Sequence, residues 1–270
     1  MAEDREILRE VWDGHIPVCF KLSVDGVYTI QHPEPYYLMV PRLSYFPLVL
    51  DKVQKHFAQH LAEEHQNAET WLDYGGQPLK WHYPIGLLFD LYANDATLPW
   101  DLTIHFQDFP KDELMHCQGR LAVESYFMAT IKEADALKHR GQVISSMQKK
   151  DHIQLWQGLQ NDKFDQFWAV NRKLMEHTND EPFKHIPFRI YQLDQPFIQR
   201  LIRPLNDMGE KQTLKHLLIM IIPDIMNQEG ELKYKVVTHG IEPSLDTPLQ
   251  WMSEHLSYPD NFLHICILPL

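Results

Sequence analysis

Two stretches of the chain, residues 14–110 and 186–270, carry the same order of apolar patterns, and this internal repeat constrains the fold more than any other feature. Each copy begins with an Ile-Pro pair and an extended apolar run. A second predicted strand, an amphipathic helix, a strand that ends at a turn glycine, a short apolar helix and an alternating last strand follow in that order. The predicted elements are 16–20, 36–40, 48–61, 71–75, a helix from Pro84 and 102–106 in the first copy, and 186–190, 197–202, a helix after Thr213, 236–240, a helix from Pro248 and 263–267 in the second.

The spacing of equivalent residues supports the repeat. Pro84 and Pro248 are 164 positions apart, and Leu102 and Leu263 are 161 apart, so the two copies stay in step. The order of elements is that of the ubiquitin-like β-grasp fold, in which one sheet packs its apolar face on one helix. The alternative that the pattern leaves open is a coincidence between two unrelated α+β units.

The region between the two copies is predicted to be helical. Val123, Phe127, Ile131 and Ala134 form one apolar stripe along the first of these helices, as is typical of a helix with one buried face. The predicted helices are 121–137, 143–150, 153–159 and 164–175, the last two with Asp151 and Asp162 as N-caps.

A short helix is predicted ahead of the first copy. Ile7, Leu8, Val11 and Trp12 give it one apolar face, and it is too short to be stable alone, so we expect it to dock on another part of the chain. The predicted fold class is therefore α+β, with two ubiquitin-like β-grasp domains that flank a helix-rich domain. The predicted boundaries are 1–13 for the N-terminal helix, 14–110 for the first ubiquitin-like domain, 111–185 for the helix-rich domain and 186–270 for the second ubiquitin-like domain.

Composition and motifs indicate a non-catalytic protein. The 270 residues include 25 basic and 37 acidic side chains, a net charge of −12 that argues against nucleic-acid binding. The sixteen histidines lack the spacing of a metal site, and His56 and His60 have no third ligand nearby in the sequence. We therefore expect no metal and no cofactor.

The cysteines give no sign of catalysis either. Cys19, Cys117 and Cys266 are scattered and form no CxxC pair, which favours plain buried thiols in a reduced, cytoplasmic protein. His116 and Cys117 are adjacent in sequence, and adjacent side chains do not face each other in regular structure. A cysteine hydrolase that uses Cys117 or His116 is kept as an alternative.

Several strings of the sequence resemble the signature of the autophagy protein five family, and the chain is identified as an animal, invertebrate member. The resemblance extends from about residue 1 to 268. The strings are PLKWHYPIGLLFDL at 78–91, KEADALKH at 132–139, MQKKDH at 147–152, FDQFW at 164–168, PLQWMSEHL at 248–256 and SYPDNF at 257–262.

The resemblance implies a scaffold in autophagy. Members of the family are joined covalently to the C-terminal glycine of the ubiquitin-like autophagy protein twelve, and the conjugate binds the coiled-coil autophagy protein sixteen without a covalent bond. The complex acts like an E3 and promotes transfer of autophagy protein eight from its E2, recruited through the conjugate, to phosphatidylethanolamine. The implied location is the cytoplasm and, peripherally, the pre-autophagosomal membrane during autophagosome assembly.

The resemblance also implies the site residues. The family's acceptor lysine directly precedes Glu-Ala-Asp-Ala-Leu-Lys-His, which makes Lys132 the expected isopeptide acceptor. The partner helix of autophagy protein sixteen is expected in a groove where the two ubiquitin-like domains and the N-terminal helix meet. Trp12, Trp81 and Trp251 are its predicted anchors, because tryptophan is frequent at interface hot spots; the alternative for each is a place in the core. The alternative to this account is an adaptor that is never conjugated.

Overall fold

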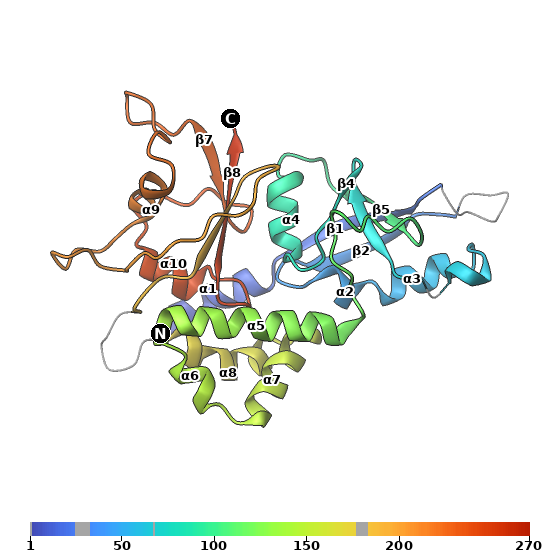
Figure 1. Ribbon diagram of the computed structural model, residues 1–270, viewed down its shortest axis with the longest axis horizontal. Helices are drawn as coiled ribbons and strands as arrows, with labels where there is room; N and C mark the ends of the chain where they lie inside the picture. The colour runs from blue at the N-terminus through green and yellow to red at the C-terminus, as the bar shows by residue number, and fades with distance from the viewer. Residues whose placement is uncertain (1, 25–32, 67, 177–182) are drawn as a thin grey trace. The chain divides into compact units, whose positions relative to one another are not determined.

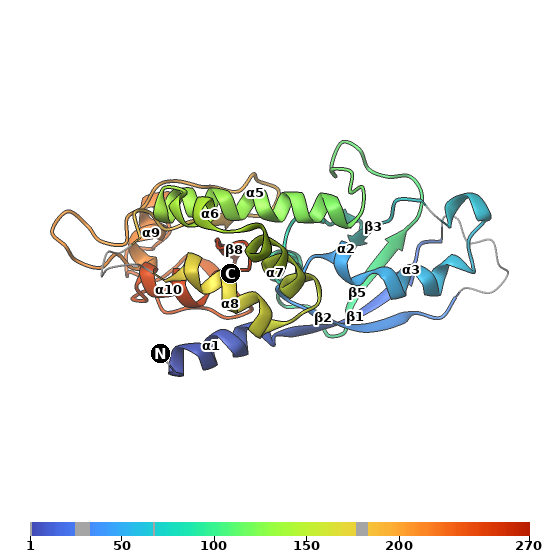
Figure 2. The ribbon, with the colours of Figure 1, turned by 90° about the horizontal axis from the view of Figure 1, so that it is seen from below.

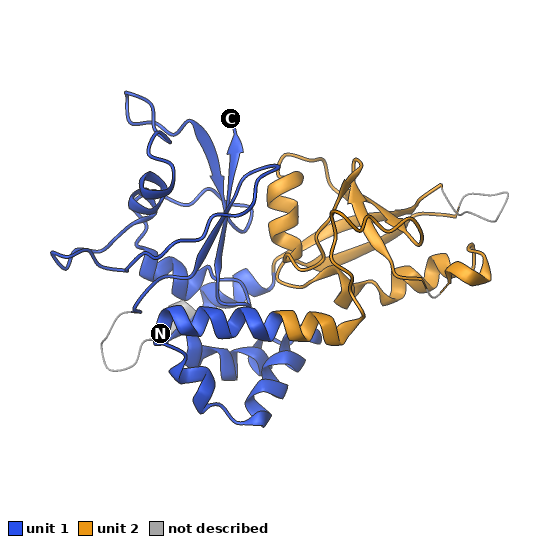
Figure 3. Cartoon of the chain, viewed as in Figure 1, with its two compact units in different colours: residues 1–13, 127–270 blue, residues 14–126 orange. Residues whose placement is uncertain are grey.

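A computed structural model describes residues 2–24, 33–66, 68–176 and 183–270. The chain divides into two compact units, which are described separately (Figure 3). Unit 2 is residues 14–126, and unit 1 combines residues 1–13 with 127–270.

Unit 2 is a β-grasp domain built on one mixed five-stranded sheet (Figure 1). The strand order is β2-β1-β5-β3-β4, and the first and last strands, β1 and β5, pair in parallel at its centre. The predicted single helix at 48–61 is wrong in its bounds, because Pro47 allows a helical turn to begin earlier and a break at Leu50 separates two helices. The elements are β1 (His15–Leu22), β2 (Tyr36–Pro41), α2 (Phe46–Val49), α3 (Asp51–Ala58), η1 (Glu63–His65), β3 (Trp71–Tyr74), β4 (Gln77–Pro78), α4 (Ile85–Tyr92) and β5 (Trp100–His105).

The C-terminal half of unit 1 repeats the β-grasp order with fewer strands. Its sheet has the order β6-β8-β7, again with the first and last strands parallel. As predicted, Leu263, Ile265 and Ile267 point into one core, in which they meet the apolar face of α9. The elements are β6 (Phe188–Tyr191), α9 (Leu214–Ile221), β7 (Tyr234–Val237), α10 (Leu249–His255) and β8 (Leu263–Pro269).

The predicted strand at 197–202 is wrong. The backbone of this segment pairs with the β6 region at the isolated bridge between Ile198 and Ile190 and through the hydrogen bond from the Ile186 N–H to the Ile202 carbonyl at 2.9 Å, and these pairings do not continue as a ladder. The Ile202 side chain is buried in the core of the domain and Ile198 packs against it, whereas Phe197 and Leu201 are exposed. The apolar content of this segment therefore does not mark a strand.

In the described part of the region between the two β-grasp domains, the chain forms four helices. The predicted cap positions are wrong by a few residues. Gln148 is the N-cap of α7, and Asp151 closes a capping box by accepting the Gln148 N–H at 3.0 Å. Lys163, not Asp162, precedes α8. The helices are α5 (Arg120–His139), α6 (Gln142–Ser146), α7 (Lys149–Gln160) and α8 (Phe164–Met175).

Helices α7 and α8 approach each other closely at Gly158. A Cβ atom at this position would lie 2.6 Å from the backbone nitrogen of Phe167, a separation that real Cβ atoms do not adopt. Because the obstacle is backbone, the helices would have to separate. We expect Gly158→Ala to lower the free energy of unfolding by about 1–3 kcal/mol. Urea unfolding measures this change, with Ile153→Ala on the exposed side of α7 as the control. Equal stability of the two variants would contradict the close approach.

Candidate functional site

Helix α5 presents Lys132 to solvent. The predicted stripe of Val123, Phe127, Ile131 and Ala134 is buried, and Lys132 lies on the exposed side. The residues one helical turn away along that side are Ala129 and Ala136, both exposed and small. The amine of Lys132 is therefore accessible to a large reaction partner.

The residue after Lys132 anchors α5 to the second β-grasp domain. Arg189 on β6 donates to Oε2 of Glu133 at 3.0 Å, and Gln199 donates to Oε1 at 2.6 Å. Arg189 also donates from Nε to Gln199 at 3.1 Å, so the three side chains close a ring of hydrogen bonds. The guanidinium lies over the rings of Phe197 and Phe262 at 4.8 and 4.3 Å. This network limits rotation of α5 and so fixes the direction in which Lys132 points.

Lys138, on the same helix, has the opposite environment. It is 2% exposed, its Nζ lies 3.2 Å from the Met175 sulfur, and it lies over the Phe183 ring at 4.7 Å. Burial lowers the pKa of Lys138 to about 7, while the carboxylates of Glu254, Asp135 and Asp260 act in the opposite direction. Lys138 thus gains a neutral amine near pH 7 but cannot reach a macromolecular substrate.

The buried amine predicts a pH-dependent stability. Between pH 7 and about 10.4 the unfolded chain keeps the Lys138 proton and the folded chain releases it, so this group makes stability rise with pH. Below pH 7 the Lys138 amine is protonated in both the folded and the unfolded state, so burial of its charge lowers the free energy of unfolding by the full desolvation cost. We expect Lys138→Met to be more stable than wild type at pH 7, and this advantage to shrink by about 3 kcal/mol by pH 9.5. Urea unfolding at both pH values measures the difference; an advantage that does not change with pH would contradict the buried amine.

The N-terminal helix, α1 (Ala2–Trp12), docks within unit 1, as its apolar face predicts. Trp12 is buried against two rings of α8, with centroid distances of 5.9 Å to Phe164 and 5.0 Å to Phe167. Val11 packs on the core of the second β-grasp domain. Helix α1 therefore joins the helical region to the β-grasp domain.

Two exposed ion pairs add to this docking. Arg5 and Arg9 both donate to Asp165 of α8, at 2.7 and 2.9 Å. The hydrogen bonds from Arg9 and Arg5 hold the pKa of Asp165 below its usual range. Exposed pairs of this kind contribute little to stability, so the buried Trp12 side chain is the main anchor.

A hollow of about 740 Å³ lies between α1, α8 and α10, which run beside one another (Figure 2). Its wall is mixed: Trp168 and Met175 supply apolar surface, and charged side chains of both signs also line it. A surface of this kind fits an amphipathic helix better than a small ligand. The lining residues are Arg5, Leu8, Asp165, Trp168, Ala169, Arg172, Met175, Glu176, Glu254 and His255.

The three predicted groove tryptophans have different surroundings. Trp12 is buried and does not line the hollow. Trp251 is 36% exposed and stacks on His255, which lines the hollow, at a centroid distance of 4.6 Å. Trp81 belongs to unit 2, where it is half-buried and its Nε1 donates to the Met115 carbonyl at 2.8 Å. Within unit 1, Trp251 is thus partly exposed at the surface, whereas Trp12 is buried.

The cysteine and histidine side chains do not form a reactive pair. The Cys117 thiol donates to the Gly119 carbonyl at 3.6 Å, and burial raises the pKa of the thiol. His116 is held by Glu69 at 2.6 Å and stacks on Phe109. A catalytic cysteine needs a lowered pKa, so this geometry is the opposite of an activated nucleophile. Within the described ranges, no group of histidine, cysteine and carboxylate side chains is placed to hold a metal, and no helix is long and apolar enough to cross a bilayer.

Comparison with known protein families identifies the three regions of the chain. Three family models match in order: the autophagy protein ATG5 UblA domain at residues 11–106, its alpha-helical bundle region at 120–177, and its UblB domain at 185–267. The chain belongs to the autophagy protein 5 family. Both ubiquitin-like domains and the helical region expected from the sequence are thereby confirmed. The exact boundaries drawn above remain predictions.

Members of the family are similar over their full length. Autophagy protein 5 of Drosophila melanogaster is 52% identical, with 99% of this chain and 98% of that protein covered, in keeping with an invertebrate origin. Autophagy-related protein 5 of Caenorhabditis elegans is 34% identical, with 98% of each covered. The crystal structure of Kluyveromyces marxianus Atg5 has the same fold, with a TM-score of 0.82 at 22% identity over 97% of this chain and 99% of that one. The chain is therefore an autophagy protein built from ubiquitin-like domains, a family that is not named for a catalytic activity.

Proposed function

We propose that this member of the autophagy protein 5 family is joined through Lys132 to the C-terminal glycine of the ubiquitin-like autophagy protein twelve. The observation that carries the proposal is the exposed Lys132 at the head of the family string at 132–139, on a helix whose other lysine is buried. The amine attacks the thioester carbonyl of the charged E2, an N–C bond forms, the C–S bond breaks, and the E2 thiol leaves. A protonated amine has no lone pair with which to attack, so a base of the E2 must take the amine's proton.

The resulting conjugate has no catalytic residue of its own in this account. It binds the coiled-coil autophagy protein sixteen and acts like an E3, promoting transfer of autophagy protein eight to phosphatidylethanolamine. The E2 for autophagy protein eight is recruited through the conjugate. The proposed location is the cytoplasm, with peripheral attachment to the pre-autophagosomal membrane through the complex.

We propose that the hollow between α1, α8 and α10 binds the partner helix. Its apolar surface and its charges of both signs suit one face of a helix from autophagy protein sixteen. Trp251 lies next to it with its ring partly exposed, so we retain Trp251 as a contact residue. Trp12 acts indirectly, because it holds α1 in place.

A reducing gel of cell lysate tests the proposal. Conjugation predicts a band heavier than the 32.0 kDa chain by about one ubiquitin-like protein, with little free form. An isopeptide bond survives reduction, whereas a thioester or disulfide does not. An adaptor that is never conjugated gives one band at the mass of the chain, and that result would reject the proposal.

The cysteine hydrolase alternative has its own test. We expect Cys117→Ser to leave both the conjugate band and the lipidation of autophagy protein eight at wild-type levels, because the thiol is protonated and held by a carbonyl. Reconstituted lipidation on phosphatidylethanolamine vesicles measures this. A Cys117→Ser protein that is conjugated normally but cannot support lipidation would restore the enzyme hypothesis.

A further inference from the structure

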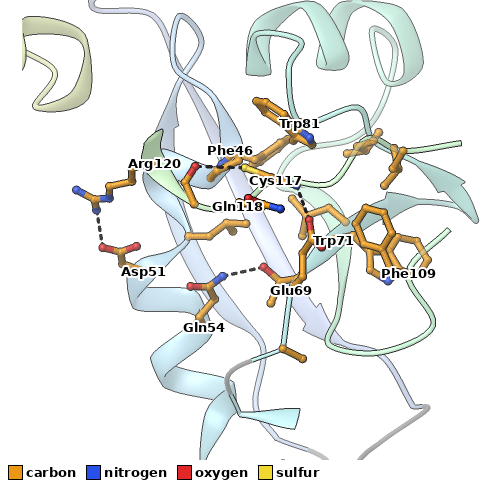
Figure 4. Close-up of a pocket in the computed structure, with 18 residues that line it drawn as sticks. Phe46, Asp51, Gln54, Glu69, Trp71, Trp81, Phe109, Cys117, Gln118 and Arg120 are labelled. Atoms are coloured by element: carbon orange, nitrogen blue, oxygen red, sulfur yellow. Dashed lines mark hydrogen bonds and ion pairs between the residues drawn. The ribbon is translucent and has the colours of Figure 1, made fainter. Parts of the chain in front are cut away.

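Unit 2 contains a cavity of about 430 Å³ that the proposed function does not use (Figure 4). Helices α2 and α3 form one wall, β3 and the segment after β4 form another, and the connector between β5 and α5 closes it. Most of the lining is apolar. Aromatic rings come from all three walls: Phe46, Trp71, Trp81 and Phe109.

The connector between β5 and α5 crosses this cavity and is held by hydrogen bonds at several points. The Trp71 Nε1–H donates to the Gln107 carbonyl at 2.9 Å, and the Trp81 Nε1–H donates to the Met115 carbonyl at 2.8 Å. Glu69 accepts from the Cys117 N–H and holds His116. The two indole N–H groups therefore have their hydrogen-bond acceptors in the connector itself, and the apolar ring surfaces line the cavity. Because the connector is held across the cavity, the space suits a compact molecule better than a helix.

The charges around the cavity are already paired. Arg120 donates to Asp51, and both oxygens of Glu69 are occupied. Gln54 differs: its Nε2 donates to Thr70 Oγ1 at 2.7 Å, and its carbonyl oxygen makes no hydrogen bond to any residue that the structure describes. The lining thus offers two side-chain amides among aromatic surfaces, those of the half-buried Gln54 and the exposed Gln118, and it offers no unpaired charge to an ion.

We propose that this cavity binds a small, uncharged, planar aromatic molecule that carries one hydrogen-bond donor, directed at the carbonyl oxygen of Gln54. The volume lies within the range of roughly 300–1,000 Å³ usual for small-molecule sites. Aromatic walls favour a flat ring by offset stacking and edge contacts. The site goes beyond conjugation at Lys132 and does not depend on it.

Cys117 provides the readout, because it lines the cavity and is half-buried. The other two cysteines, Cys19 and Cys266, are fully buried. The full-length protein is treated with iodoacetamide, and alkylation of Cys117 is followed by peptide mass spectrometry. The probes are indole and 2-naphthol, which are neutral bicyclic rings with one donor, and indole-3-acetate, which carries a charge.

Indole and 2-naphthol are expected to slow alkylation of Cys117 in a saturable way, by about tenfold at ten times the half-saturating concentration. Indole-3-acetate is expected to give no protection at the same concentrations. Gln54→Leu should raise the half-saturating concentration for indole but leave that for naphthalene, which has no donor, unchanged. Gln59→Leu, an exposed position after α3, is the matched control.

Ala68→Phe places a ring inside the cavity and is expected to remove protection by every probe. The thermal midpoint of Ala68→Phe shows whether this variant folds. If it does not fold, the comparison of Gln54→Leu with wild type still tests the proposal. Absence of saturable protection by both neutral probes would overturn the proposal. Equal protection of wild type and a folded Ala68→Phe would do the same.

Discussion

Replacing Lys132 with arginine is expected to abolish the heavy conjugate band and the lipidation of autophagy protein eight. Arginine keeps the positive charge and the length of the side chain, but its guanidinium stays protonated and does not attack a thioester. Lys132 is exposed, and the anchoring of α5 through Glu133 does not involve its side chain, so folding is expected to be unchanged. Partner binding is also expected to be unchanged.

The control is Lys150→Arg, an exposed lysine of α7 in the same region of the chain. It should be conjugated like wild type. Immunoblots of reducing gels report the conjugate, and vesicle lipidation reports the downstream step. A normal heavy band in Lys132→Arg would show that another lysine is the acceptor and that the resemblance was transferred to the wrong residue.

Trp12→Ala is expected to weaken binding of the autophagy protein sixteen helix while conjugation at Lys132 persists. Truncation of a buried tryptophan costs about 3–5 kcal/mol, and Trp12 supplies the largest buried contact of α1. A helix of 11 residues has little stability of its own, so loss of this contact detaches it. The hollow then loses one of its three walls.

The expected loss of affinity is at least about tenfold, equivalent to roughly 1.4 kcal/mol. Titration of a labelled partner helix against Trp12→Ala and against a chain that lacks residues 1–13 measures it. Glu10→Ala, an exposed position of α1, is the control and should bind like wild type. Wild-type affinity in both altered chains would mean that α1 is dispensable and that the hollow is not the binding site.

The sequence predicted the fold well wherever local pattern and burial agree. The alternation of Leu263, Ile265 and Ile267 and the four-residue stripe of α5 both follow directly from packing against one core. The segment 197–202 has a similar apolar content, but Ile202 is buried without continuous strand pairing, and a pattern of apolar residues cannot separate these two cases. Asp151 was predicted as the N-cap of α7 but lies three residues after the N-cap, because an acidic residue stabilises a helix at either position.

The site was less accessible to sequence reasoning. An exposed lysine on a helix has no chemical signal of its own, so only the family string singled out Lys132. The anchoring of α5 was not predicted, since Glu133 lies 56 and 66 positions from its partners Arg189 and Gln199. Docking of the apolar face that includes Trp12 was predicted, but its partners in α8 are about 150 positions away in sequence and could not be identified from the sequence.

The most direct test of the account is the mass spectrum of the endogenous heavy band after digestion with trypsin. Trypsin cannot cut after a lysine whose amine is in an isopeptide bond. The account therefore predicts a branched peptide that spans residues 121–138, uncut at Lys132 and joined there to the C-terminal glycine of the ubiquitin-like modifier. A heavy band whose branch maps to another lysine, together with unmodified peptides that end at Lys132, would contradict it.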